Sequence, residues 1–304
     1  MIGSVISPFL DAVTKINSVK KVETILPIAR KVAHVTPLLV GDDLSLRTSL
    51  TSPVGYDREM IQILYNHHEF VEEDKNVKYK YQQFCQEVSN IDKISLLWAL
   101  YRSTYDTLGS KDRKMTCPKD GCKSEFTNTI YLEDLVHEDT YFPWAEELQF
   151  HEFVHPIIVN YEAGGQTYVY EFLTRLPSIQ NNNQLLSMIS IDVLQKNLEA
   201  IGSIFTKPQQ MSLLTKAIRI SSTDGSVPTA ETADLTEMLM AFQNHIPYIV
   251  SEEFFDKYNE QFSKYIPKYY KELECPMCKH KWTMNVDIEL EFFRRCLFGG
   301  GKSE

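Results

Sequence analysis

The sequence predicts an α+β fold, and three observations lead to that prediction. Apolar residues recur at helical spacing through most of residues 1–110 and again through residues 181–271. Between these segments, residues 111–180 include stretches that alternate between apolar and polar side chains, as strands do. One cysteine pair precedes the second helical segment and another follows it. We therefore expect a mainly helical N-terminal region, a β region formed by 111–180 together with 272–298, a helical insertion between its two parts, and a flexible tail at 299–304.

The first expected element is helical and covers residues 1–34. Its apolar stripe is long, and Pro27 is expected to bend or restart the segment. The stripe is either a face for a partner or the side that packs on the rest of the domain, and both readings stay open. Its members are Val5, Ile6, Phe9, Leu10, Val13 and Ile16, continued by Val19, Val22, Ile25 and Leu26.

Three further elements are expected before residue 90. Residues 38–50 are short and strand-like. A helix is expected to begin near Asp57, which can cap its N-terminus. Another helix is expected over about Val77 to Val88. The side chains that the first of these helices directs inward are Met60, Ile61 and Leu64.

The clearest helical pattern covers residues 92–108. Asp92 can cap its N-terminus, and Gly109 stands where a left-handed residue commonly ends a helix. The apolar residues that repeat at helical spacing are Ile94, Leu97, Trp98, Tyr101, Tyr105 and Leu108.

A β-hairpin is expected in the middle of the chain. Its strands are Phe153 to Asn160 and Gln166 to Thr174, and residues 161–165 contain the Gly-Gly pair that suits a tight turn. Residues 177–184 are polar and are expected to form a loop.

Residues 185–271 return to a helical pattern, which is interrupted at Pro208, at 221–229, at Pro247 and at Pro267. The end of this segment, from Phe254 to Tyr270, is rich in aromatic residues. A buried helix face is the default reading of that spacing, and an interface is the alternative.

Two cysteine pairs are the most informative feature for function. The first is Cys117-Pro118-Lys119-Asp120-Gly121-Cys122, and the second is Cys275-Pro276-Met277-Cys278. Four residues after each pair stands an aromatic, Phe126 or Trp282, and strand-like sequence follows as far as Leu132 or Ile288. Two such half-sites can present four thiolates to one tetrahedral zinc ion. We therefore predict a structural zinc ribbon with Cys117, Cys122, Cys275 and Cys278 as ligands, whose two following strands are candidates to pair with one another.

A redox role is the main alternative for the paired cysteines. A thioredoxin-like pair opens a helix, whereas strand-like sequence follows both pairs here. Four thiolates would also fill the coordination shell, so the predicted site is structural rather than catalytic. His280 is a candidate substitute ligand that ranks below Cys278. The lone Cys85 and Cys296 are expected to be small buried hydrophobes.

Composition bounds the class of protein. The chain is 43% apolar and 12% aromatic, which is enough for a packed core and excludes global disorder. No apolar run is long enough to span a bilayer, and the first ten residues lack a secretory pattern, so the cysteines are expected in a reducing compartment. The net charge of −10 disfavours nucleic acid as a partner. Lysines near both cysteine pairs are expected to offset the charge of four thiolates.

One catalytic pattern occurs, and we reject it. Residues His151-Glu152-Phe153-Val154-His155 fit the motif of zinc proteases, in which a helix places both histidines on one face and the glutamate is the base. Pro156 follows at once and disfavours helical geometry at His155. No nucleotide-binding loop or nucleophile elbow is found. His67 and His68 adjoin a predicted helix end and are expected at the surface.

The order of these elements resembles the baseplate hub and assembly family of contractile-tailed, T-even-like bacteriophages. The resemblance covers about residues 38–180, and it depends on pattern and order. The helical stretch after residue 180 and the second cysteine pair are more elaborate than the family pattern. The features that carry the resemblance are Leu46-Arg47 before a helix, Phe84-Cys85 on the next helix, the run from Asp92 to Ser103, the Gly109 turn, the first cysteine pair, the acidic segment Leu132 to Leu135, the hairpin, and Leu176-Pro177.

What the resemblance implies is a role without catalysis. The chain would be a structural component of the virion tail baseplate, or an assembly factor for its hub, made in the host cytoplasm. Its partners would be other tail baseplate proteins, with a homo-oligomer in a symmetric assembly as a further option. Two other functions are weighed against this one: a zinc-ribbon protein that binds nucleic acid, and the metalloprotease that the rejected motif would require.

Overall fold

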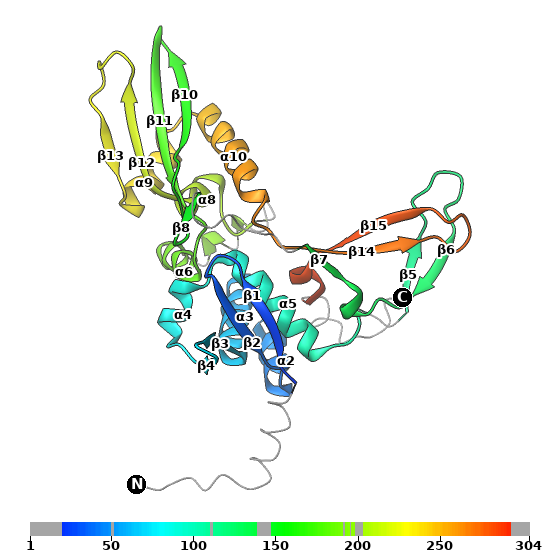
Figure 1. Ribbon diagram of the computed structural model, residues 1–304. Helices are drawn as coiled ribbons and strands as arrows, with labels where there is room; N and C mark the ends of the chain where they lie inside the picture. The colour runs from blue at the N-terminus through cyan, green and yellow to red at the C-terminus, as the bar shows by residue number, and fades with distance from the viewer. Residues whose placement is uncertain are drawn as a thin grey trace, which may run out of the picture.

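Two four-stranded sheets and one projecting arm organise the molecule (Figure 1). The computed structural model describes residues 20–49, 52–109, 112–138, 147–190, 192–194, 196–197 and 203–292. Helices and strands are mixed along these ranges, which confirms the α+β class. The predictions for the stripe at residues 5–19, for Cys296 and for the tail at 299–304 lie outside the described residues. No helix within the described ranges is long and apolar enough to cross a membrane.

The first sheet is antiparallel and follows the order β1-β2-β3-β4. It corrects the prediction of a helix through residue 34, because the described part of that segment is a β-hairpin. Burial alternates along β1, and Thr24 contacts the carbonyl of Ser95 on the helix that covers the sheet. The strands are β1 (Val22–Leu26), β2 (Lys31–Val35), β3 (His68–Glu72) and β4 (Lys75–Val77).

Four helices accompany this sheet, and their bounds correct three predictions. The segment expected as a strand at 38–50 is helix α2, and the helix expected to start near Asp57 begins at Pro53 with Ser52 as its N-cap. The helix expected to start at Val77 begins four residues later, because Val77 belongs to β4. The helices are α2 (Val40–Ser49), α3 (Pro53–His67), α4 (Tyr81–Glu87) and α5 (Asn90–Thr104).

Helix α5 was expected over 92–108, and its ends differ from that prediction. Ser89 is the N-cap, and Asp92 completes a capping box by accepting from the Ser89 backbone. The helix ends with Tyr105 as its C-cap, so Gly109, with φ of +63°, serves a later turn. Most of α5 is buried, including Trp98 and Tyr101.

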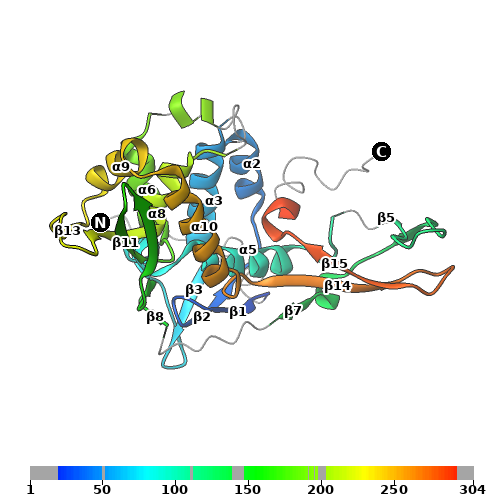
Figure 2. The same cartoon turned by 90° about the horizontal axis from the view of Figure 1, so that it is seen from above.

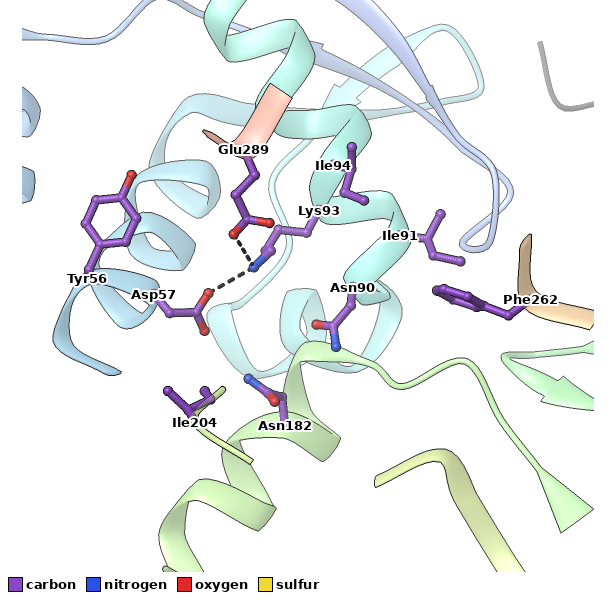
Figure 3. Close-up of a pocket in the computed structure, with 10 residues that line it drawn as sticks. All are labelled: Tyr56, Asp57, Asn90, Ile91, Lys93, Ile94, Asn182, Ile204, Phe262 and Glu289. Atoms are coloured by element: carbon purple, nitrogen blue, oxygen red, sulfur yellow. Dashed lines mark hydrogen bonds and ion pairs between the residues drawn. The ribbon is translucent and has the colours of Figure 1, made fainter. Parts of the chain in front are cut away.

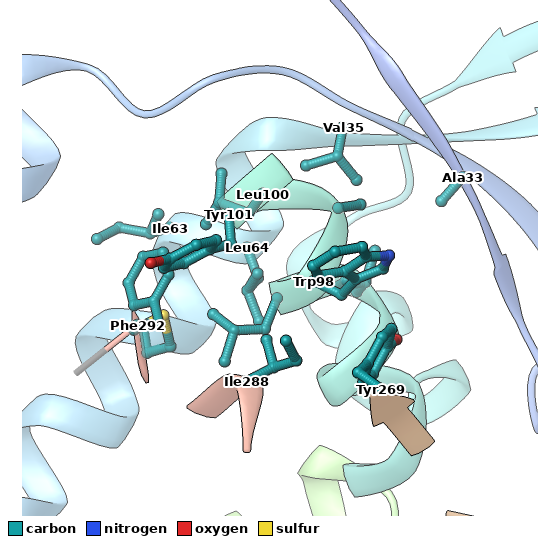
Figure 4. Close-up of a cluster of buried hydrophobic side chains, with 14 of the residues drawn as sticks. Ala33, Val35, Ile63, Leu64, Trp98, Leu100, Tyr101, Tyr269, Ile288 and Phe292 are labelled. Carbon is teal, nitrogen blue, oxygen red and sulfur yellow. The ribbon is translucent and has the colours of Figure 1, made fainter. Parts of the chain in front are cut away.

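The core around α5 also includes residues from the far end of the chain. Figure 4 shows Tyr269, Ile288 and Phe292 beside Trp98 and Tyr101. The rings of Trp98 and Tyr269 lie 4.8 Å apart, and those of Tyr101 and Phe292 lie 5.9 Å apart. The C-terminal part of the described chain therefore belongs to the N-terminal core.

The second sheet has the order β10-β11-β12-β13. The predicted hairpin is confirmed as β10 and β11, with Gly164 and Gly165 as its two-residue turn. The interrupted helical pattern predicted for 185–271 is wrong where β12 and β13 complete this sheet and where a further strand begins at Lys268. The strands are β10 (Ile157–Ala163), β11 (Gln166–Thr174), β12 (Thr215–Ser222) and β13 (Ala230–Thr232).

Helices cover one face of the second sheet (Figure 1). Phe254 and Tyr258 on α10 are buried, and the Phe254 ring lies 4.8 Å from Phe172 on β11, so the core reading of these aromatics is confirmed. The loop predicted at 177–184 is wrong, because Ser178 and Asn181 form a capping box that starts α6. The helices are α6 (Ile179–Met188), α8 (Lys207–Leu214), α9 (Leu235–Asn244) and α10 (Tyr248–Ser263).

The arm is built from two β-hairpins that extend away from both sheets (Figures 1 and 2). Each strand that follows a cysteine pair is bonded to the strand before that pair, so the two following strands do not pair with one another as proposed from the sequence. Strand β14 also pairs with β7 near the body. The strands are β5 (Arg113–Thr116), β6 (Glu125–Asn128), β7 (Val136–Glu138), β14 (Lys268–Glu274) and β15 (Lys281–Val286); the short η1 (Leu132–Asp134), β8 (Leu148–Gln149) and β9 (Glu152–Phe153) lie between β6 and β10.

Candidate metal centre

The two cysteine pairs lie at the turns of the two arm hairpins. Cys117 and Cys122 close the hairpin of β5 and β6, and Cys275 and Cys278 close that of β14 and β15. The structure therefore brings together all four residues predicted as ligands. Their separation in sequence is large, at 153 residues between Cys122 and Cys275.

The two turns share a backbone geometry. The Cys117 amide donates to the carbonyl of Ser124 at 3.0 Å, and the Cys275 amide donates to the carbonyl of His280 at 2.9 Å. Both acceptors stand two residues after the second cysteine of their pair. The residue between, Lys123 or Lys279, has positive φ in each case, at +46° and +56°. The two extra residues of the first pair therefore lie between its cysteines, and the backbone that follows the second cysteine has the same geometry in both turns.

The four sulfur atoms form one compact group. Cys117 Sγ lies 3.7 Å from Cys278 Sγ, and Cys122 Sγ lies 3.8 Å from Cys275 Sγ. All four lie within 4.8 Å of one another. A tetrahedral zinc ion with bonds of about 2.3 Å to sulfur needs its ligands about 3.8 Å apart. The donor set and its spacing therefore fit a four-thiolate metal ion.

Burial and one hydroxyl distinguish the four thiols. Cys117 and Cys275 are buried, whereas Cys122 and Cys278 are half-buried. Ser124 Oγ lies 3.3 Å from Cys122 Sγ and 3.2 Å from Cys275 Sγ. Hydrogen bonding by Ser124 lowers the pKa of Cys275 to about 6 and also lowers that of Cys122, while burial raises the pKa of Cys117 to about 12. Ser124 was not predicted from the sequence, although its place two residues after Cys122 was a usable signal.

Aromatic side chains hold the two hairpins together beside the sulfurs. The Phe126 and Trp282 rings meet edge to face with centroids 5.9 Å apart, which explains why an aromatic follows each pair at the same offset. The ring of His280 is stacked on Trp282 at 6.2 Å. Among the described residues, the group that could hold a metal consists of the four cysteines, and the His280 ring is not part of it. The backbone carbonyl of His280 instead accepts the hydrogen bond from the Cys275 amide.

The lysines near the sulfurs face carboxylates in their own hairpins. Lys123 Nζ lies 3.1 Å from Asp120, while Lys279 and Lys281 lie 3.6 and 3.9 Å from Glu274. These lysine side chains are more than half exposed. Such pairs contribute little stability, and they leave the charge near the metal centre mixed in sign.

The rejected protease motif is not helical. Residues 148–153 form the small β8–β9 hairpin, with Phe150 and His151 at positive φ of +40° and +69°. His151 is buried, and Glu152 pairs with Lys216 at 2.6 Å. The helix face that would bring His151 and His155 to one ion is therefore absent from this segment.

Three other side chains named from the sequence are also placed. Cys85 is buried, as predicted. His67 and His68 are buried, so the prediction that they lie at the surface is wrong. His67 is hydrogen-bonded to Asp42 at 2.8 Å and to Thr36 at 3.0 Å. His68 is hydrogen-bonded to the carbonyl of Leu64, and burial lowers the pKa of His68 to about 4.

Comparison with known proteins returns no relative: no protein-family model, no curated protein and no solved structure matches this chain.

Proposed function

We propose that this chain is a zinc-binding structural or assembly protein of a bacteriophage contractile-tail baseplate, and that it acts by binding other tail proteins. It would be made in the host cytoplasm and would serve in the hub region of the virion tail baseplate. The group of four sulfurs on the arm is the observation that carries the metal-binding part. The resemblance of residues 38–180 to the baseplate hub family supports the assignment to a phage tail.

Zinc is the metal that this donor set favours in a structural role. Four thiolates in a tetrahedron suit zinc or iron, and zinc needs no redox chemistry to hold two hairpins together. All four positions of the ion would be occupied by protein, which leaves none for a substrate. The metal would therefore supply rigidity to the arm, and Cys117, Cys122, Cys275 and Cys278 would hold it.

Two of the segments that carry the resemblance differ in secondary structure from what the sequence indicated. Phe84-Cys85 lies on α4, the run from Asp92 to Ser103 lies on α5, and Leu176-Pro177 follows β11, which ends at Thr174. Leu46-Arg47, read as a β segment from the sequence, lies on α2. The acidic segment Leu132 to Leu135, read as the end of a strand, contains the short helix η1. The support for a baseplate role therefore rests on the other segments after residue 80.

Metal content tests the first part of the proposal. We expect about one zinc per chain in the purified protein, and its loss in both Cys117→Ser and Cys275→Ser. Thr283→Ala is the matched control, because Thr283 is an exposed residue on β15 that is not a ligand. Two zinc ions per chain, one of which survives the cysteine changes, would instead point to His151 and His155. Iron in place of zinc would overturn the choice of metal.

Binding to defined tail proteins tests the second part. The purified chain is expected to form a stoichiometric complex with at least one baseplate protein, measured by light scattering coupled to size exclusion. Binding to none of a full set of baseplate proteins would contradict the proposal. Nucleic-acid binding is the weaker candidate, because the exposed lysines of the arm face Asp120 and Glu274.

A further inference from the structure

A cavity of about 550 Å³ lies where α3, α5, α6, α10 and the helical turn at 288–292 meet. Figure 3 shows that its lining comes from distant parts of the chain, including Asp57 on α3, Asn182 on α6 and Phe262 on α10. It is separate from the metal centre, whose residues do not line it. Neither the predicted motifs nor the proposed metal role uses this cavity.

The charges in the cavity leave one negative charge in excess. Lys93 Nζ lies 2.9 Å from Asp57 Oδ1 and 3.3 Å from Glu289 Oε1, as the dashed lines in Figure 3 show. Burial opposes the charge of Lys93, but Asp57 and Glu289 outweigh it and raise the pKa of the ammonium group. One cation and two carboxylates therefore give a formal charge of −1, and the Glu289 side chain is 52% exposed and open to another cation.

Two side-chain amides in the cavity have unused hydrogen-bonding capacity. Asn182 is 8% exposed, and within the described ranges no residue bonds the side-chain amide of Asn182 or that of Asn90. Figure 3 shows both amides turned toward the same part of the cavity, beside Asp57. Neither amide is among the buried side-chain groups that lack a partner, so both are accessible from the cavity and can accept hydrogen bonds from a ligand there.

The remaining walls are apolar and partly aromatic. Ile91, Ile94 and Ile204 line the cavity with Phe262, whose ring is half-buried and stacked on Tyr258. A planar cation can lie against such a ring while its polar edge faces carboxylates and amides. The alkyl stem that carries the cation can contact the isoleucines.

We propose that this cavity binds the guanidinium group of an arginine side chain presented by a partner protein. Its five N–H donors match the acceptors on Asp57, Glu289, Asn90 and Asn182, and its single charge matches the excess of one carboxylate. An ammonium group has three donors and no planar face, so lysine fits less well. An anionic ligand would be repelled by the excess negative charge of Asp57 and Glu289. The inference gives a partner chemistry to the proposed protein-binding role, but its test requires no phage protein.

The test is a titration of full-length protein, with ¹⁵N in its asparagine side chains, with N-acetyl-arginine amide. We expect shifts in the amide signals of Asn90 and Asn182, assigned by substitution, with a dissociation constant on the order of 1 mM for so small a probe. N-acetyl-citrulline amide, which has nearly the same shape without the charge, is expected to bind at least about tenfold more weakly. The affinity for N-acetyl-lysine amide is expected to lie between those for the arginine and citrulline probes.

Glu289→Gln is the decisive variant, because the exposed side chain can be changed without opening the core. It is expected to lower the affinity for the arginine probe about tenfold. Glu260→Gln, on the exposed side of α10 and outside the cavity, is expected to leave that affinity unchanged. Equal binding of citrulline and arginine would overturn the charge argument. Absence of shifts with every probe would overturn the site itself, while leaving the metal content and the tail-protein complex to be judged separately.

Discussion

Asp92 is a single buried carboxylate that joins the turn of the first hairpin to the start of α5. It accepts from the amides of Ile28 at 2.8 Å and Ala29 at 3.1 Å, and from the amide and hydroxyl of Ser89 at 3.0 and 2.8 Å. Burial nevertheless outweighs these bonds and raises its pKa to about 6. Folding therefore favours the protonated acid between the ordinary pKa of an aspartate and pH 6.

This shift predicts a specific pH dependence. A raised folded-state pKa means that the folded chain binds more protons than the unfolded chain between about pH 4 and 6, so stability falls as pH rises through that window. Relative to Asp92→Asn, the free energy of unfolding is expected to fall on the order of 2 kcal/mol from pH 4 to 7. Urea unfolding at several pH values measures it.

Asp74→Asn, which removes an exposed carboxylate in place of a buried one, serves as the control for this experiment. A difference between the parent chain and Asp92→Asn that is flat with pH would show that Asp92 stays ionised when folded.

Substitution of Ser124 is expected to weaken zinc binding without abolishing it. Its hydroxyl contacts two of the four sulfurs, so Ser124→Ala removes a hydrogen bond that supports the ligands without removing a ligand. Zinc affinity is expected to drop by about ten- to a hundredfold, as measured by competition with a chromophoric chelator. Thr283→Ala is expected to have no effect. An unchanged affinity in Ser124→Ala would mean that the metal-bound sulfurs do not use this hydroxyl.

At the scale of elements, the hairpin of β10 and β11 was predictable because its local signals agree. Alternating residues and a Gly-Gly turn fit one structure, and both glycines have the positive φ that a two-residue turn of this kind requires. The predicted four-cysteine group was also found, since each half-site is a short turn whose cysteines stand close in sequence.

The turn supplies a prediction about stability. Gly165 has φ of +79° and open space around it, so Gly165→Ala meets backbone strain and no steric clash. The free energy of unfolding is expected to fall by about 1 kcal/mol. Gly164→Asn is expected to be neutral, because asparagine suits the first position of such a turn. Equal losses in both variants, measured by chemical denaturation, would argue for an effect other than backbone conformation.

Other elements could not be predicted because tertiary contacts or unusual caps decide them. Val22, Ile25 and Leu26 fit helical spacing, yet all three pair with β2 in a strand that packs on α5 and leaves Ile25 exposed. Leu44 and Leu46 alternate like a strand, but Leu46 is the buried residue of α2 and Leu44 is exposed. Ser178 starts α6 with Asn181 in the place that glutamate or glutamine usually takes, so the signal was missed.

At the scale of the whole molecule, the arm and the body differ in what holds them. The second sheet packs on helices through buried aromatics such as Phe172 and Phe254, whereas the arm consists of two hairpins joined at their turns. A two-stranded hairpin is marginal by itself, so the tip of the arm depends on the metal centre.

Removal of the metal is therefore expected to loosen one part of the molecule selectively. With a chelator, amide hydrogen exchange is expected to accelerate over residues 113–128 and 271–285, while residues 157–174 keep their protection. Cys117→Ser without chelator is expected to give the same pattern. Uniform acceleration over all three segments would instead show that the metal stabilises the entire fold.

The distance in sequence between the two cysteine pairs also bears on the timing of synthesis. Cys275 is made 153 residues after Cys122, an interval of about 8–30 s at the usual elongation rates of about 5–20 residues per second. During that interval the first pair is a dithiol without its complement, and a chain that stops before residue 275 never acquires four ligands. A bound metal ion would thus distinguish chains synthesised through Cys278 from shorter ones, before either meets a partner.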